Sequence, residues 1–196
     1  MRSLIRPAVV LFVFFTVVTG LLYPLVITGI TQVAFADAAA GSILTRDGKP
    51  IGSRLIGQNF SDPKYFWGRP SATSPQPYGG TASSGSNLGP LNPALIDGVK
   101  AHIQALHDAD PGNAQPIPVD LVTASASGLD PEESIAAALY QVPRVARLRG
   151  LDVQAVKGLI GAHAQGRFLG VFGEPRINVL ELNVALDGLA PGSGSR

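Results

Sequence analysis

Hydrophobic positions in this chain fall into one unbroken run followed by shorter periodic segments. The run has no charged residue from Pro7 to Ala36 and follows Arg2 and Arg6. As an α-helix, residues 7–33 extend roughly 40 Å at ~1.5 Å per residue, which is enough to cross a hydrocarbon core of about 30 Å. Because a single span must satisfy its own backbone in lipid, the run predicts one transmembrane helix.

The charges around this span predict its orientation. Arg2 and Arg6 precede it, whereas Asp37 and small residues follow it, and the next basic residue is Arg46. The positive-inside rule therefore places the N-terminus in the cytoplasm and the rest of the chain outside the plasma (inner) membrane. A cleaved secretory signal is the alternative, because residues 34–36 read Ala-Phe-Ala, although the apolar run exceeds a usual signal core.

One face of the predicted helix carries small and polar residues at intervals of four. They are Thr16, Gly20, Pro24, Thr28 and Gln32. Small side chains let a second helix approach closely, and Thr or Gln can form hydrogen bonds across such a contact. Pro24 is expected to bend the helix. The stripe predicts a partner helix, and chance recurrence of common membrane residues is the alternative.

The predicted fold class is α+β, with a single N-terminal transmembrane helix followed by one extracytoplasmic mixed α/β domain. Residues 1–36 form the cytoplasmic N-terminus and anchor, residues 37–187 the domain, and residues 188–196 a disordered tail rich in Gly, Pro and Ser. Within the domain, residues 71–92 contain mostly Ser, Gly and Pro, which is typical of a flexible linker. A loop of this length inside a domain is unusual unless it is functional.

Periodicity and turn residues predict the remaining elements. Two strands flank the Asp47-Gly48 turn, at 41–45 and 50–57. Helices are predicted at 93–108, 131–142 and 152–165, with Asn92 and Asp130 as N-caps, and strands at 119–125 and 168–177. Residues 179–186 alternate as in a strand, but Asn178 and Glu181 resemble a capping box, which favours a helix.

Composition removes several functional classes. A net charge of +1 gives no basic excess for nucleic acid, and the absence of cysteine excludes disulfides, thiolate metal sites and thiol catalysis. The three histidines are interpreted as structural or exposed rather than as metal ligands, and no Gly-x-Ser-x-Gly nucleophile motif occurs. No catalytic residue or metal site is therefore predicted.

Two polar segments are candidates for binding. Residues 81–89 are rich in Gly and Ser, but a phosphate loop needs Gly-Lys-Ser/Thr and no lysine lies between Lys64 and Lys100, so an ordered polar loop is favoured. Arg144, Arg147 and Arg149 form either a solvated face or a docking surface for acidic groups of a partner, since arginine pairs bidentately with carboxylates.

Several longer stretches carry a resemblance to a known family. They follow one another behind the single N-terminal helix and cover nearly the whole chain: Gly52–Gln58, Tyr65–Thr73, Ser84–Pro90, Asp120–Pro131, Gln141–Ala146 and Gly173–Leu180. Together they resemble the C subunit of the Kdp-type potassium-transporting ATPase. Glu133 departs from this pattern, in which an apolar residue is usual.

The resemblance implies an accessory, non-pumping subunit that is not an enzyme by itself. Its implied partners are a P-type ATPase subunit, a potassium-channel-like subunit and a small single-helix subunit in the membrane. The expected partner-binding residues are the helix stripe together with Tyr65, Trp67, Arg69 and Arg144. The alternatives are an anchored or secreted binding module that acts alone, and a free-standing extracytoplasmic enzyme.

The resemblance also implies a catalytic chaperone that raises the ATP affinity of the ATPase subunit through a transient ternary complex. No cofactor is expected to bind tightly to this chain. Because ATP is cytoplasmic and the domain is predicted outside, such an effect would pass through the membrane part. If the family contacts nucleotide directly, the implied positions here are Gln141 and the loop residues Ser84, Gly85, Ser86 and Asn87.

Overall fold

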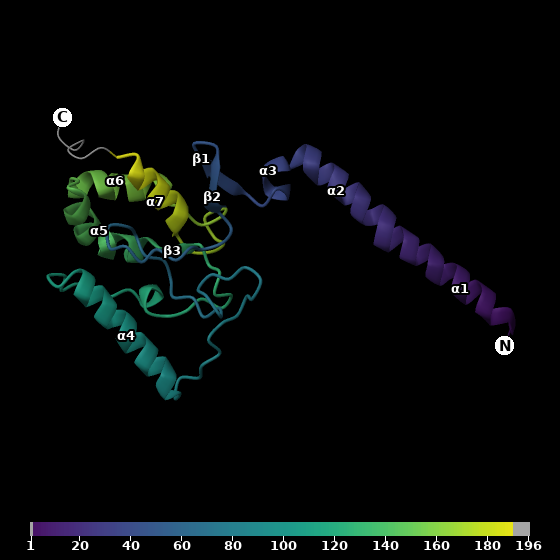
Figure 1. Ribbon diagram of the computed structural model, residues 1–196, viewed down its shortest axis with the longest axis horizontal. Coiled ribbons are helices and arrows are strands. Elements are labelled where there is room, and N and C mark those ends of the chain that lie inside the picture. Colours follow the sequence, from purple (N-terminus) through teal and green to yellow (C-terminus); the bar gives the residue numbers. More distant parts are fainter. Residues whose placement is uncertain (1, 190–196) are drawn as a thin grey trace. The chain divides into compact units, whose positions relative to one another are not determined.

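The computed structural model describes residues 2–189 (Figure 1). The chain divides into two compact units, Met1–Ile51 and Gly52–Arg196. The first unit contains one helix, Leu4–Ala34, that is long and apolar enough to cross a membrane. Mixed helix and strand content with one N-terminal apolar helix is thus confirmed. The predicted disordered tail falls mainly on residues 190–196, outside the described residues.

The first unit consists of the apolar helix and a hairpin. The helix comprises α1 (Arg2–Val17), the π-helical turn η1 (Val18–Leu22) and α2 (Tyr23–Ala34). A short helix, α3 (Ala36–Ala39), leads to strands β1 (Ile43–Arg46) and β2 (Lys49–Ser53). The hairpin turns at Asp47 and Gly48, both with positive φ, as the sequence predicted.

Up to residue 189, the second unit combines four α-helices with one short strand pair. The helices are α4 (Pro93–Ala109), α5 (Ile135–Arg149), α6 (Val153–His163) and α7 (Val179–Asp187). Strands β3 (Glu132–Ser134) and β4 (Arg176–Asn178) pair antiparallel, with Glu133 opposite Ile177. The predicted caps Asn92 and Asn178 accept hydrogen bonds from the backbone N–H groups of Ala94 and Glu181, so both of these helix starts are confirmed.

Two hydrophobic clusters hold this unit together. The larger one joins α5, α6, α7 and β4 around fully buried side chains that include Phe66, Val145, Val156, Ile177 and Leu182. The smaller one joins α4 and α5 through Leu106, Ala137 and Tyr140, with Trp67 packed against it. Residues 58–70 are rich in aromatic side chains and are called the aromatic segment here. Because Phe66 belongs to the larger cluster and its neighbour Trp67 packs against the smaller one, this segment lies between the two clusters.

The predicted helix at 131–142 begins too early. Asp130 instead accepts the N–H of Glu132 in a local turn and pairs with Arg69, which leaves residues 132–134 extended in β3. Ser134 is the N-cap, and its hydroxyl accepts the N–H of Ala137 at 3.0 Å. The helix then continues through Pro143 to Arg149, because its buried face extends beyond the proline.

The two strands predicted at 119–125 and 168–177 are also wrong for most of their length. Val119–Leu121 form a 3₁₀ turn, η2, and the hydroxyl of Thr123 donates to the carbonyl of Val119 at 2.8 Å. Only Arg176–Asn178 belong to a strand in the second segment, because residues 168–172 close into a tight turn. Periodicity alone did not detect these turns.

Candidate functional site

Two buried amides hold the aromatic segment in place. Oδ1 of Asn183 accepts the N–H of Phe66 at 2.9 Å, and its Nδ2 donates to the carbonyl of Phe66 at 2.9 Å. Gln141 forms the same pair with Trp67, at 2.8 and 3.0 Å. Each side chain therefore satisfies a backbone N–H and C=O together, as a neighbouring strand would.

Arg144 extends this network. Its side chain is fully buried, and its Nη1 donates to the carbonyls of Pro63 and Tyr65 while its Nη2 donates to Oε1 of Gln141 at 2.6 Å. The guanidinium stacks 4.5 Å from the ring centroid of Trp67. Burial lowers the pKa of Arg144 to about 10, against the opposing effect of Asp110 and Glu133, so the group remains charged at neutral pH.

Glu133 brings a carboxyl group into the same interior. Its Oε2 accepts Nε2 of Gln141 at 3.1 Å, and its Oε1 has no hydrogen-bond partner among residues 2–189. Burial raises the pKa of Glu133 well above its ordinary value, and the Asp120 carboxylate adds to this, while Arg144 and Gln141 oppose it. The carboxyl is therefore favoured in its neutral form in the folded chain.

We expect Glu133→Gln to stabilise the protein. Because the folded-state pKa is raised, the folded chain binds more protons than the unfolded chain above the ordinary carboxyl pKa, and stability falls as pH rises through that window. An amide removes this fall and should add about 1–3 kcal/mol at neutral pH. Thermal unfolding between about pH 5 and pH 8 measures it, with the exposed Glu174→Gln as a control of little effect. A Glu133→Gln variant that is less stable at the upper pH would contradict the prediction.

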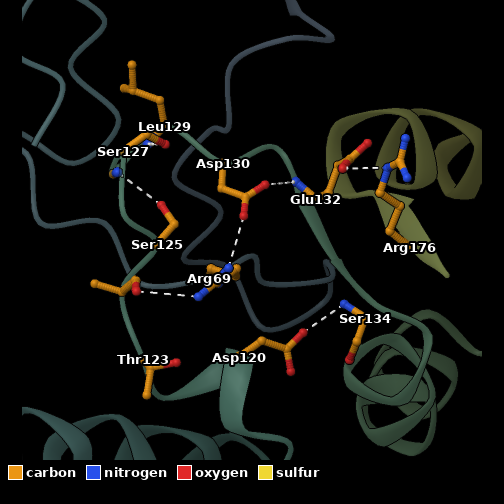
Figure 2. A network of polar contacts seen from close by, with 12 residues as sticks. Arg69, Asp120, Thr123, Ser125, Ser127, Leu129, Asp130, Glu132, Ser134 and Arg176 are labelled. Carbon is orange, nitrogen blue, oxygen red and sulfur yellow. Dashed lines mark hydrogen bonds and ion pairs between the residues drawn. The ribbon is translucent and has the colours of Figure 1, made fainter. Parts of the chain in front are cut away.

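A second polar cluster lies around Arg69, at a groove of about 710 Å³ (Figure 2). Arg69 pairs with Asp130 at 3.1 Å and donates to the carbonyl of Ala124 at 3.4 Å. Glu132 pairs with Arg176 at 2.7 Å across β3 and β4. These pairs join the segment before α5 to the aromatic segment and to β4.

Residues 71–92 contain no helix or strand, but hydrogen bonds hold them against other segments of the second unit at several points. Ser71 donates to the carbonyl of Gly128 at 2.6 Å, the hydroxyl of Tyr78 donates to the carbonyl of Arg69, and the N–H of Ser84 donates to the carbonyl of Ser127 at 2.9 Å. Burial raises the pKa of Tyr78 to about 12, with the Glu133 and Asp130 carboxyls adding to the effect. These contacts argue against a flexible linker, and they agree with the ordered polar loop that was favoured for residues 81–89.

The five residues implied for nucleotide contact do not form one cluster of contacts. Ser84 and Gly85 lie against residues 126–127, and Asn87 has a positive φ of 51°. Gln141 is only 1% exposed, and both the oxygen and the nitrogen of its side-chain amide form hydrogen bonds with the backbone of Trp67. In the described part of the chain, no hydrogen bond or ion pair joins Gln141 to Ser84, Gly85, Ser86 or Asn87. Nucleotide contact at these positions stays a prediction.

The expected partner-binding residues of the second unit have different surroundings. Trp67 and Arg69 line a pocket of about 300 Å³ with Phe60, Tyr78 and His102. Tyr65 stacks under the guanidinium of Arg149 at 4.5 Å. Arg144 is interior, Arg149 is 15% exposed and Arg147 is 53% exposed, so the arginines do not share one solvated face. Contact of these residues with a partner stays a prediction.

In the apolar helix, a π turn precedes Pro24. Proline has no N–H to donate, and the N–H of Tyr23 reaches back to the carbonyl of Val18, five residues earlier. In a regular α-helix, residues four apart drift by about 40° per step, since 3.6 residues complete a turn. The wider π turn offsets part of this drift, which helps to keep Thr16, Gly20 and Pro24 on one face. The hydroxyl of Thr16 donates to the carbonyl of Phe12 at 2.8 Å and can only accept from a partner.

Residues 2–189 thus contain one apolar helix long enough to cross a membrane, and the buried amides and guanidinium of the second unit bind its own backbone. Residues 5–188 match the family described as KdpC: K+-transporting ATPase, c chain, and the chain belongs to this family. It is therefore related to an accessory subunit of a potassium-transporting ATPase rather than to a catalytic one.

Several curated relatives support this assignment. The potassium-transporting ATPase KdpC subunit of Dechloromonas aromatica is 64% identical over 190 residues, covering 97% of this chain and 100% of the relative. That of Ralstonia nicotianae is 65% identical over 187 residues, covering 95% and 92%. That of Polaromonas naphthalenivorans is 60% identical over 191 residues, covering 97% of each.

The sequence alone did not indicate that Asn183 and Glu133 belong to the buried polar network. Asn183 stands in the middle of an apolar helix, which was the available signal for a buried amide. Glu133 is buried in β3, which fits the apolar residue that the resemblance implied for this position.

Proposed function

We propose that this chain assembles and stabilises an ATP-driven, high-affinity potassium uptake complex as its accessory subunit. Membership of the KdpC family over residues 5–188 is the observation that carries the proposal. The apolar helix supports it, because Leu4–Ala34 is long enough to cross a membrane and carries the small-residue stripe. Small residues on one helix face allow a partner helix to pack closely against it.

The proposed partners are a P-type ATPase subunit, a potassium-channel-like subunit and a small single-helix subunit. The proposed location is the plasma (inner) membrane, with the N-terminus in the cytoplasm and the second unit outside. The basic residues Arg2 and Arg6 before the span and the acidic residue Asp37 after it support this orientation.

We further propose that the chain raises the ATP affinity of the ATPase subunit indirectly, through the span. The proposed orientation separates the second unit from cytoplasmic ATP. Direct contact at Gln141 would require the release of its hydrogen bonds to Trp67 and of the buried Arg144, which supports the indirect route. ATP would accordingly be present only in the ternary complex with the ATPase subunit, with none held tightly by this chain.

The outer unit is proposed to lie over the extracellular mouth of the potassium-conducting subunit, where the loop 71–92 would shape ion entry. Deletion of residues 71–92 with the anchor retained is expected to impair potassium uptake under limiting potassium. Normal uptake in this deletion would contradict the role given to the loop.

Two glycines of the loop allow a finer test. A Cβ at Gly85 would meet the carbonyl oxygen of Ala126 at 2.8 Å, whereas a Cβ at Gly89 meets nothing within 4 Å among the described residues. Gly85→Ala should therefore loosen the docked loop at a cost of about 1–3 kcal/mol and lower uptake, while Gly89→Ala should leave it unchanged. Equal uptake by both variants, at equal amounts of complex, would argue against loop docking as a functional element.

A further inference from the structure

A tight turn between α6 and β4 presents large apolar side chains to solvent. Phe168 is 69% exposed, Leu169 75%, Val171 72% and Phe172 63%. Single exposed apolar residues are common on protein surfaces, but a contiguous group of this kind marks an interaction site. The turn makes no part of either hydrophobic cluster.

Four of the five backbone N–H groups of residues 168–172 donate to carbonyls of the turn or of the residue before it. Phe168 and Phe172 exchange N–H···O=C bonds at 2.8 and 3.0 Å. The N–H of Gly170 donates to the carbonyl of Arg167 at 3.1 Å, and that of Val171 to the carbonyl of Phe168 at 3.2 Å. A protein partner gains from free backbone donors, whereas a lipid environment requires that they be paired internally.

The turn has charged residues at its base and an apolar residue at its tip, which suits a position at a membrane–water interface. Arg167 and Glu174 pair at the base of the turn, where Nη2 contacts the two carboxylate oxygens at 3.0 and 2.8 Å. Leu169 adopts φ +52°, a conformation for which Gly or Asn is usual, so the chain keeps an apolar side chain at the tip against the local preference.

We propose that the turn 168–172 inserts into the interface of the bilayer that holds the chain's own anchor. The span Leu4–Ala34 and the second unit are joined by residues 35–51, which reach at most about 60 Å at ~3.5 Å per residue. The second unit is thus tethered within this distance of the bilayer that holds the span. Apolar side chains at such a depth lie about 5–10 Å into the headgroup and acyl boundary. The turn is a second membrane contact, and it depends only on the anchor being in the membrane.

Because the sequence contains no cysteine, an introduced cysteine is the only thiol of this chain, and a sample without it measures the labelling of the other subunits. Leu169→Cys is labelled with an environment-sensitive fluorophore in the full chain, purified with its accompanying subunits and reconstituted into lipid nanodiscs. Leu91→Cys is the matched control, since Leu91 is 92% exposed in another loop. The label at 169 should emit at shorter wavelength and lose fluorescence when the lipids carry a shallow spin label, and the label at 91 should do neither.

Two outcomes overturn the proposal. Emission at long wavelength at 169 means that the turn faces water, and emission at short wavelength without quenching by the spin-labelled lipids means that a protein surface covers it.

Phe172→Asp supplies a further check, because Phe172 is outside the core and folding should persist. This variant should reduce lipid quenching at 169 while uptake assays and co-purification verify that the complex is intact; unchanged quenching would also contradict insertion.

Discussion

Replacement of Arg144 by alanine is expected to lower the free energy of unfolding by roughly 3–5 kcal/mol. The substitution removes the donor that the carbonyls of Pro63 and Tyr65 use and the hydrogen bond to Gln141. It also removes the guanidinium that stacks on Trp67. The aromatic segment should then separate from α5, and thermal or denaturant unfolding followed by tryptophan fluorescence reports this directly.

Arg167→Ala provides the matched control for that experiment. Arg167 also pairs with a carboxylate, but it is 46% exposed and its partner 78%, so its loss should cost about 1 kcal/mol or less. Arg144→Lys keeps the charge but lacks the planar guanidinium with its several N–H donors. Its free energy of unfolding should therefore lie closer to that of the alanine variant than to that of the parent. Equal stabilities of Arg144→Ala and Arg167→Ala would refute the central role of the buried guanidinium.

Replacement of residues 8–33 by an unrelated membrane helix is expected to abolish assembly with the proposed partner subunits. The swap keeps an anchor and removes the stripe of Thr16, Gly20, Pro24, Thr28 and Gln32 together with the π turn before Pro24. Co-purification from membranes measures the effect. Full retention of assembly and uptake would favour the alternative of a binding module that acts alone.

A pair of single substitutions separates the stripe from the helix as a whole. Gly20 lies on the stripe and Gly29 does not, and a Cβ added at either glycine would meet nothing within 4 Å among the described residues. Gly20→Leu should weaken association by about tenfold, from ~1–2 kcal/mol of lost helix packing, whereas Gly29→Leu should not. A stronger effect at Gly29 would mean that the partner lies against another face.

Neighbouring residues in the sequence were sufficient to predict the elements whose ends are fixed by turn or capping residues close to them. The apolar run, the Asp47-Gly48 hairpin and the helices that begin after Asn92 and Asn178 were all predicted from neighbouring residues. The start of α5 was not, because Asp130 is engaged by Arg69, which lies 61 residues away in the sequence. Capping residues were thus reliable predictors only where no distant charge competes for them.

The buried network illustrates the same limit for the site. Trp67 and Arg144 were expected to bind a partner and Gln141 was implied for nucleotide contact, but their mutual contacts are not visible in the sequence. Gln141 meets Trp67 across 74 residues and Asn183 meets Phe66 across 117. Sequence patterns therefore identified candidate residues, and only the fold showed that they hold one backbone segment together.

The most direct test of the proposed function is to identify what this chain assembles with. The protein is tagged at its C-terminus, produced in cells grown under potassium limitation and extracted in mild detergent, and the co-purifying proteins are identified. We predict a P-type ATPase and a potassium-channel-like subunit, with ATPase activity that falls when this chain is absent. Recovery of a solitary protein shortened at Ala36 would contradict both the retained anchor and the role as an accessory subunit.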